Sequence, residues 1–216
     1  MPIYIPERAV VPKPEPEDPI DYYYRPLTGK IYRDRLEISM SMLGEQKSEA
    51  LLEVGYGSGI LLPELARRTK RLVAIDIHRK AADVYRMLDH EGVKAELHEG
   101  NLYDMPFTDG EFDALACFSV LEHLTDLDGA LREFARVTRP GAVLALGFPV
   151  RNTITDTFFR LAGFNPRKIH PSSHRDIEQA IRRQPLLNLD QVRVFPKHLP
   201  TQLSLYVSCR CTRTSG

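Results

Sequence analysis

The stretch Leu51-Leu52-Glu53-Val54-Gly55-Tyr56-Gly57-Ser58-Gly59-Ile60 decides the fold. Its first four residues form a short, mostly apolar run, typical of a strand buried on both faces, and this run leads into three alternating glycines. Glycine is needed where a backbone turns sharply or must approach a ligand closely. Because a helical spacing of leucines follows, we predict a strand, a glycine loop and a helix. A loop of this kind without a ligand is an alternative that the motif alone leaves open.

The residues in and around this loop narrow the ligand that it can hold. A dinucleotide loop would need glycine where the chain has Ile60, and a P-loop would need a Lys that is absent here. The Glu53 carboxylate would repel a pyrophosphate, whereas it would attract an ammonium or sulfonium group. The pattern therefore favours a cationic nucleoside.

A second acidic residue supports a nucleoside ligand. Asp76 follows the apolar run Leu72–Ile75 and lies 21 positions after Gly55. An acidic residue about twenty positions beyond such a loop, at the tip of the neighbouring strand, can bind ribose hydroxyls. A lone Asp there could instead cap a helix. Together with the loop, the spacing favours the ribose.

Repeated strand and helix patterns predict an α/β fold with a doubly wound, mostly parallel sheet. Two alternating runs near the C-terminus are joined by a link too short for a parallel crossover, so we expect the final strand to be antiparallel. The expected strands are 50–54, 72–75, 93–98, 114–118, 142–148, 191–195 and 202–208, seven in all. The expected helices begin near Tyr32, Leu61, Ala81, Leu127 and Ser173.

Composition sets limits on location and partners. The 216 residues carry 29 basic and 29 acidic side chains, which leaves no net charge to attract nucleic acid or an anionic membrane. No apolar run is long enough for a membrane span, no leader is visible at the start, and three cysteines do not form a disulfide framework. We expect a cytoplasmic protein of undetermined oligomeric state.

The N-terminus differs from the rest of the chain. Six of the sixteen prolines fall within the first nineteen residues, and proline can neither propagate a helix nor complete a sheet ladder. We expect residues 1–21 to form an extended, poorly ordered arm and residues 22–216 to form a single domain.

Five ordered motifs resemble class I S-adenosylmethionine-dependent methyltransferases, in particular the methyltransferase type 11 subgroup. The glycine loop resembles the first motif of the family, and Asp76 resembles the second. Three further matches are the segment Glu99–Asp113, the loop Ser119-Val-Leu-Glu-His-Leu124 and the helix-turn Ala130–Gly141. The resemblance covers about residues 50–150, which include the cofactor half of the domain at about 50–148. It implies a Rossmann-like fold, S-adenosylmethionine as cofactor and S-adenosylhomocysteine as product.

The resemblance also implies roles for single residues. Glu53 would lie near the methionine amino group, Asp76 would bind the ribose, and Ile77 would pack on the adenine. Asn101, where the subgroup usually has Asp, would accept from the adenine amine, since an amide oxygen is also an acceptor. The implied cofactor-binding residues are Glu53, Gly55, Tyr56, Gly57, Gly59, Asp76, Ile77, Asn101, Leu102, Cys117 and Phe118.

His123 is the candidate catalytic residue. The family pattern places it beside the transferred methyl group, where it could act as a general base. It could instead only orient the Glu122 loop or pack at the start of the helix. Some ubiquinone-pathway relatives carry Glu-x-x-Glu-His here and are thought to bind a divalent metal, but Ser119 replaces the first Glu, so we expect no metal. His170, His174 and His198 match no ligand spacing and are expected to be solvated or capping.

Two segments remain for the acceptor, residues 22–44 and 149–188. Both contain aromatic clusters, Tyr22, Tyr23, Tyr24 and Tyr32 in one and Phe158, Phe159 and Phe164 in the other. We expect a largely apolar pocket for a small molecule under a lid. The tyrosines could instead anchor the arm, and the aromatics could be the core beneath surface helices. A module that binds S-adenosylmethionine without catalysis, or a macromolecular acceptor, remains the alternative function.

Overall fold

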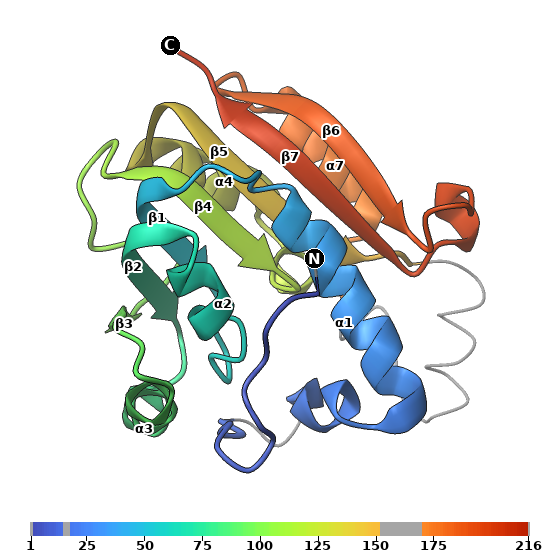
Figure 1. Cartoon of the computed structure of the whole chain (residues 1–216). Coiled ribbons are helices and arrows are strands. Elements are labelled where there is room, and N and C mark those ends of the chain that lie inside the picture. The colour runs from blue at the N-terminus through green and yellow to red at the C-terminus, as the bar shows by residue number, and fades with distance from the viewer. Residues whose placement is uncertain (1, 15–17, 152–169, 216) are drawn as a thin grey trace.

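The computed structural model describes residues 2–14, 18–151 and 170–215, and it contains a seven-stranded sheet of order β3-β2-β1-β4-β5-β7-β6 (Figure 1). All neighbouring strands from β3 to β5 pair in parallel, whereas β7 is antiparallel to both of its neighbours. The expected doubly wound α/β sheet with an antiparallel final strand is confirmed. The strands are β1 (Ser48–Val54), β2 (Thr69–Asp76), β3 (Glu96–Glu99), β4 (Phe112–Phe118), β5 (Thr138–Pro149), β6 (Leu187–Phe195) and β7 (Tyr206–Arg213).

Helices cover both faces of the sheet (Figure 1). The helices α1 (Pro26–Ser41), α2 (Leu62–Ala66) and α3 (Ala81–Glu91) pack into one core, and α4 (Leu127–Val137) and α7 (His174–Arg183) pack into the other. Short 3-10 turns are η1 (Pro19–Tyr23), η2 (Leu121–His123) and η3 (Thr201–Leu203). Among the described residues, no helix has the length and apolar character to cross a membrane.

The central strands are buried on both faces because their side chains alternate between the two cores. Leu52 and Val54 of β1 face the core of α4 and α7, while Leu51 faces the core of α1 to α3. β4 follows the same pattern, with Cys117 on the first side and Phe118 on the second. This alternation explains the continuous apolar runs in the sequence.

Several strand boundaries differ from expectation, among them the starts of β7 and β5. The last strand was expected at 202–208, but residues 201–203 form the turn η3, in which Leu203 N–H donates to the Pro200 carbonyl at 2.8 Å, and β7 begins at Tyr206. β5 begins at Thr138 and includes the expected turn at Pro140 and Gly141, where its pairing register with β4 shifts between Phe112 and Ala114. In both places a local turn replaces or interrupts the pairing with a neighbouring strand.

The N-terminal arm contributes side chains to the core beside α1, while its order stays a prediction. Ile3, Val11 and Ile20 are buried in the core beside α1, α2 and α3. The Tyr24 hydroxyl donates to the Pro6 carbonyl at 2.7 Å, and Arg8 pairs with Asp21 at 2.7 Å. The prolines prevent regular structure, but the apolar residues between them still bury surface.

Two left-handed glycines, Gly59 in the loop after β1 and Gly92 at the C-cap of α3, provide a matched pair of variants. A Cβ at Gly59 (φ 73°) would lie 2.5 Å from Val84 Cγ1 of α3, whereas a Cβ at Gly92 (φ 64°) would meet nothing within 4 Å. Both Gly→Ala changes carry the same left-handed backbone cost, and only Gly59→Ala adds overpacking of roughly 1–3 kcal/mol. Chemical denaturation should therefore show Gly59→Ala less stable than Gly92→Ala by about that amount. Equal stabilities would contradict the packing of α3 on the loop.

Candidate active site

The glycine loop lies at the carboxyl end of β1, between the ends of β2 and β4. Gly55, Gly57 and Gly59 all have positive φ, which side chains other than glycine rarely adopt. A Cβ at Gly55 would lie 2.3 Å from Val120 Cγ2 in the loop after β4. The loop therefore holds its backbone in a form that only glycine allows, at the edge where open α/β sheets bind ligands.

Asp76 and His78 brace this loop from the end of β2. Asp76 Oδ2 accepts from Gly57 N–H at 2.8 Å, and Asp76 Oδ1 accepts from His78 N–H at 3.2 Å. His78 Nδ1 accepts from Lys80 N–H, so its Nε2 carries the proton and donates to the Gly57 carbonyl at 2.8 Å. We did not predict a role for His78 from the sequence, although it lies only two residues after Asp76.

Glu53 is a buried carboxylate at the end of β1. Its side chain belongs to a residue only 4% exposed, and Oε2 has no hydrogen-bond partner among the described residues. Burial, with a smaller contribution from the Asp76 charge, raises the pKa of Glu53 from 4.5 to about 8. An unpaired carboxylate oxygen is costly in the interior, and a cationic ligand group would compensate for it. The residues present therefore fit a ligand that carries an ammonium or sulfonium group.

The other expected adenosine contacts lie on neighbouring loops. Ile77 is 76% exposed, as an apolar platform for a ring would be. Asn101 is exposed, and its Oδ1 accepts from Tyr103 N–H at 3.0 Å, so its side chain already braces its own loop, which also contains the half-buried Leu102. The Tyr56 side chain is buried and packs edge-on against the His78 ring. Their roles toward a cofactor stay predictions.

Cys117 and Phe118 end β4 and are both buried. Burial raises the pKa of the Cys117 thiol well above its usual range, and the charges of Glu122 and Glu53 add to this effect. The thiol is therefore protonated and can only pack in this state. Whether either side chain contacts a ligand stays a prediction.

The loop after β4 begins at a strained residue. Ser119 has φ 58°, and its N–H donates to the Gly147 carbonyl at 2.7 Å. Its hydroxyl lies 3.0 Å from the Tyr206 hydroxyl of β7. The Arg35 guanidinium of α1 lies 5.1 Å from the Tyr206 ring and 4.1 Å from the Tyr32 ring, and its Nη2 donates to the Tyr23 hydroxyl. This contact set joins α1, β7 and the loop, and no sequence pattern indicated it.

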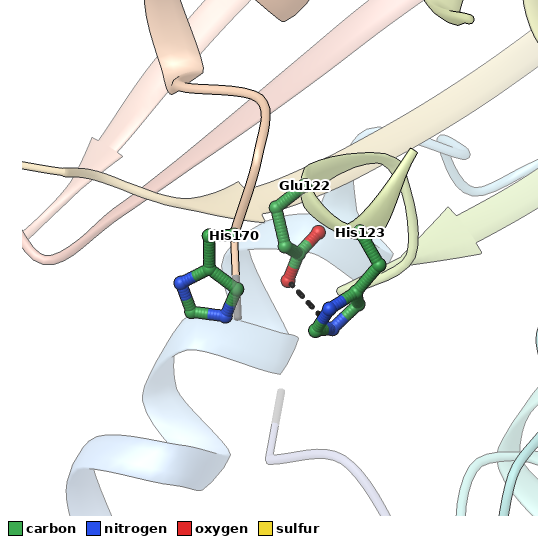
Figure 2. A group of neighbouring side chains, drawn as sticks. All are labelled: Glu122, His123 and His170. Atoms are coloured by element: carbon green, nitrogen blue, oxygen red, sulfur yellow. Dashed lines mark ion pairs between the residues drawn. The ribbon is translucent and has the colours of Figure 1, made fainter. Parts of the chain in front are cut away.

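His123 lies at the end of η2 beside two other polar side chains, as Figure 2 shows. Its side chain is 50% exposed, and its Nε2 lies 4.0 Å from Oε1 of the buried Glu122. The ring of His170, which precedes α7, lies 5.1 Å from the His123 ring. The sequence placed His123 and Glu122 together, but the proximity of His170 was missed. Of the other expected acceptor segment, residues 152–169 lie outside the described residues, Phe158, Phe159 and Phe164 among them.

The strand order, the glycine loop and the acid at the end of β2 together define the class I S-adenosylmethionine-dependent methyltransferase fold. Residues 52–146 match the family model described as "Methyltransferase domain". This match runs from β1 into β5 and supports a class I S-adenosylmethionine-dependent methyltransferase.

Known proteins resemble the chain over different extents. The ubiquinone biosynthesis O-methyltransferase of Alkalilimnicola ehrlichii is 29% identical over 151 residues, which are 68% of this chain and 61% of that protein. The crystal structure of geranyl diphosphate C-methyltransferase from Streptomyces coelicolor A3(2) has a TM-score of 0.71 at 17% identity and covers 99% of this chain and 92% of that chain. The 4+2 cyclase SpnF has a TM-score of 0.68 at 16% identity, covering 85% and 82%. At these identities the two structures show the fold alone. The chain spans about half the length of the curated relatives it matches.

The buried Glu53 predicts a pH-dependent stability difference. Its folded pKa of about 8 lies above the ordinary 4.5, so its contribution to stability is present below about pH 4.5 and is lost as the pH rises toward 8. Each unit within this window costs about 1.4 kcal/mol. The Glu53→Gln variant lacks this loss, so its free energy of unfolding relative to the unsubstituted chain should rise between pH 5 and pH 8.

Denaturant titrations at several pH values check this, with the exposed Glu45→Gln as the control. Parallel stability curves for Glu53→Gln and the unsubstituted chain would contradict the assignment.

Proposed function

We propose that the chain transfers the methyl group of S-adenosylmethionine to a small-molecule acceptor. The observation that carries this proposal is the buried Glu53 at the glycine loop, whose Oε2 has no hydrogen-bond partner within the described part of the chain. When bound, the cofactor supplies an electrophilic methyl group on a sulfonium. Glu53 faces the positive end of the cofactor, Asp76 takes the ribose hydroxyls, and Ile77 packs on the adenine.

The chain's own residues position the reactants and exclude water. Transfer by in-line displacement depends on the alignment of the reactants and the exclusion of water more than on strong acids or bases. The N-terminal arm contributes to dryness, because Asp18 Oδ2 lies 3.8 Å from the point where a Cβ would stand on Gly57. Asp18 of the arm therefore lies close to the glycine loop.

We place the acceptor between the loop after β4 and the aromatic side chains of η1 and α1. Tyr22 stacks on Tyr32 at 5.6 Å, and Tyr32 lies under the Arg35 guanidinium. Rings with polar tips make walls for a small organic molecule. The name of the ubiquinone O-methyltransferase relative supports an acceptor of this kind. The cytoplasmic location stays a prediction.

A second function has support from one comparison. SpnF has this fold and is described as a cyclase, so the fold by itself does not establish methyl transfer. A chain that only binds the cofactor would give no methylated product. Transfer of label from methyl-labelled S-adenosylmethionine into metabolites of a cell extract separates the two functions.

Calorimetry tests the cofactor directly. S-adenosylmethionine and S-adenosylhomocysteine should bind, and NAD should not. Asp76→Asn keeps an acceptor for Gly57 N–H but loses the charge, so binding should weaken by roughly 1–3 kcal/mol while the fold is kept. Asp83→Asn, on the exposed face of α3, serves as the control. Binding of NAD in preference to both sulfur nucleosides, or unchanged affinity in Asp76→Asn, would refute the assignment.

The acceptor position predicts a separation of turnover from cofactor affinity. Tyr32→Leu removes one aromatic contact, worth roughly 0.5–1.5 kcal/mol, so label transfer at limiting acceptor should fall about 2- to 10-fold. Cofactor affinity should stay unchanged, because the proposal assigns Tyr32 to the acceptor and not to the cofactor. Tyr85→Leu on α3 is the control, and both rates should be measured with the same extract. Equal rates in the two variants would place the acceptor elsewhere.

A further inference from the structure

We propose that Glu122, His123 and His170 form a binding site for a divalent transition metal of the zinc type. Each residue offers one ligand atom, and these atoms all lie within 4.8 Å of one another. Figure 2 shows the two imidazole rings on either side of the Glu122 carboxylate. Zinc requires each ligand atom at about 2 Å, so the three side chains would have to rotate toward the ion to bind it.

The donor set selects the kind of metal. Two imidazole nitrogens and one carboxylate suit zinc and its neighbours, and this set leaves a coordination position open. Mg²⁺ and Ca²⁺ prefer oxygen ligands and would find one carboxylate here. The site therefore differs in kind from the Glu-x-x-Glu-His pattern, whose first glutamate is Ser119 in this chain. The Ser119 hydroxyl instead lies against Tyr206.

An independent observation supports a cation as the ligand. Glu122 is only 2% exposed, and its Oε2 has no hydrogen-bond partner among the described residues. A buried carboxylate oxygen without a partner is expensive, and a bound cation removes that cost. Because His123 is half exposed, the cluster can be reached from solvent.

The fold holds His170 in place against η2. Ser172 N–H donates to the Glu122 carbonyl at 3.3 Å, and the Ser172 hydroxyl donates to the Leu124 carbonyl. On the other side, Arg151 donates to the His170 carbonyl at 3.0 Å. Helix α7 begins directly afterwards with a capping box at Ser173 and Asp176. Supporting contacts of this kind orient the ligands of metal sites.

The metal would change the role of His123. Coordination uses the nitrogen lone pair that a general base needs, so His123 becomes a ligand. A metal at the end of β4 could bind an acceptor oxygen and lower the pKa of its hydroxyl group. This consequence rests on the proposed methyl transfer, whereas metal binding itself does not.

Metal titration of the full, chelator-stripped chain tests the site. We expect one Zn²⁺ per chain by calorimetry, and Co²⁺ should give the absorption bands of a nitrogen- and oxygen-ligated ion. Excess Mg²⁺ should not displace Zn²⁺. His170→Ala and Glu122→Gln should each weaken Zn²⁺ binding at least about tenfold. His198→Ala, an exposed histidine on the β6–β7 connection, should bind as the unsubstituted chain does.

Each outcome decides the proposal. Zn²⁺ binding that His170→Ala leaves unchanged, equal losses in His198→Ala, or Mg²⁺ binding in place of Zn²⁺ would overturn it. Thermal melts establish that the variants are folded. S-adenosylmethionine affinity, measured on the same samples, should not depend on His170, so failure of the metal site is distinguishable from failure of the proposed function.

Discussion

The active site depends on the reversal of the chain after β1 through three left-handed glycines. A Cβ at Gly55 or Gly59 would collide with Val120 or Val84, side chains from two different segments. The loop can therefore lie tightly between β4 and α3 only if it has no side chains at these positions. That constraint aligns the ends of β1, β2 and β4, and it brings Glu53, Asp76 and the loop after β4 to one edge of the sheet.

Several features at this edge of the sheet lower the stability of the fold. Glu53 and Glu122 are both buried, and burial raises the pKa of each to about 8. Each has one carboxylate oxygen without a hydrogen-bond partner in the segments that the structure describes. Ser119 adds a backbone conformation that residues other than glycine rarely adopt. Unpaired polar groups and strain persist where function requires them, and here they gather around one rim of the sheet. A cationic ligand would stabilise the two carboxylates.

Much of the cofactor half could be predicted because its signals are local. The glycine spacing, the acid after β2 and the alternating apolar runs each follow from the geometry of one strand and its following turn. The ends of the chain were harder. Ile3 and Val11 lie among prolines, and no periodicity showed that they would be buried in the core. Likewise, the start of β7 depends on its pairing with β5 and β6, which outweighs the apolar alternation around residue 202.

The sequence by itself determined the fold class, the glycine loop and the positions of Glu53 and Asp76, because each depends on residues that are close together in the chain. Only the tertiary structure brought His170 beside Glu122 and His123, and joined Arg35 of α1 to Tyr206 of β7. Those contacts cross 47 and 171 positions of sequence. No local pattern encodes them, because they arise only when the sheet and its helices fix where distant segments meet.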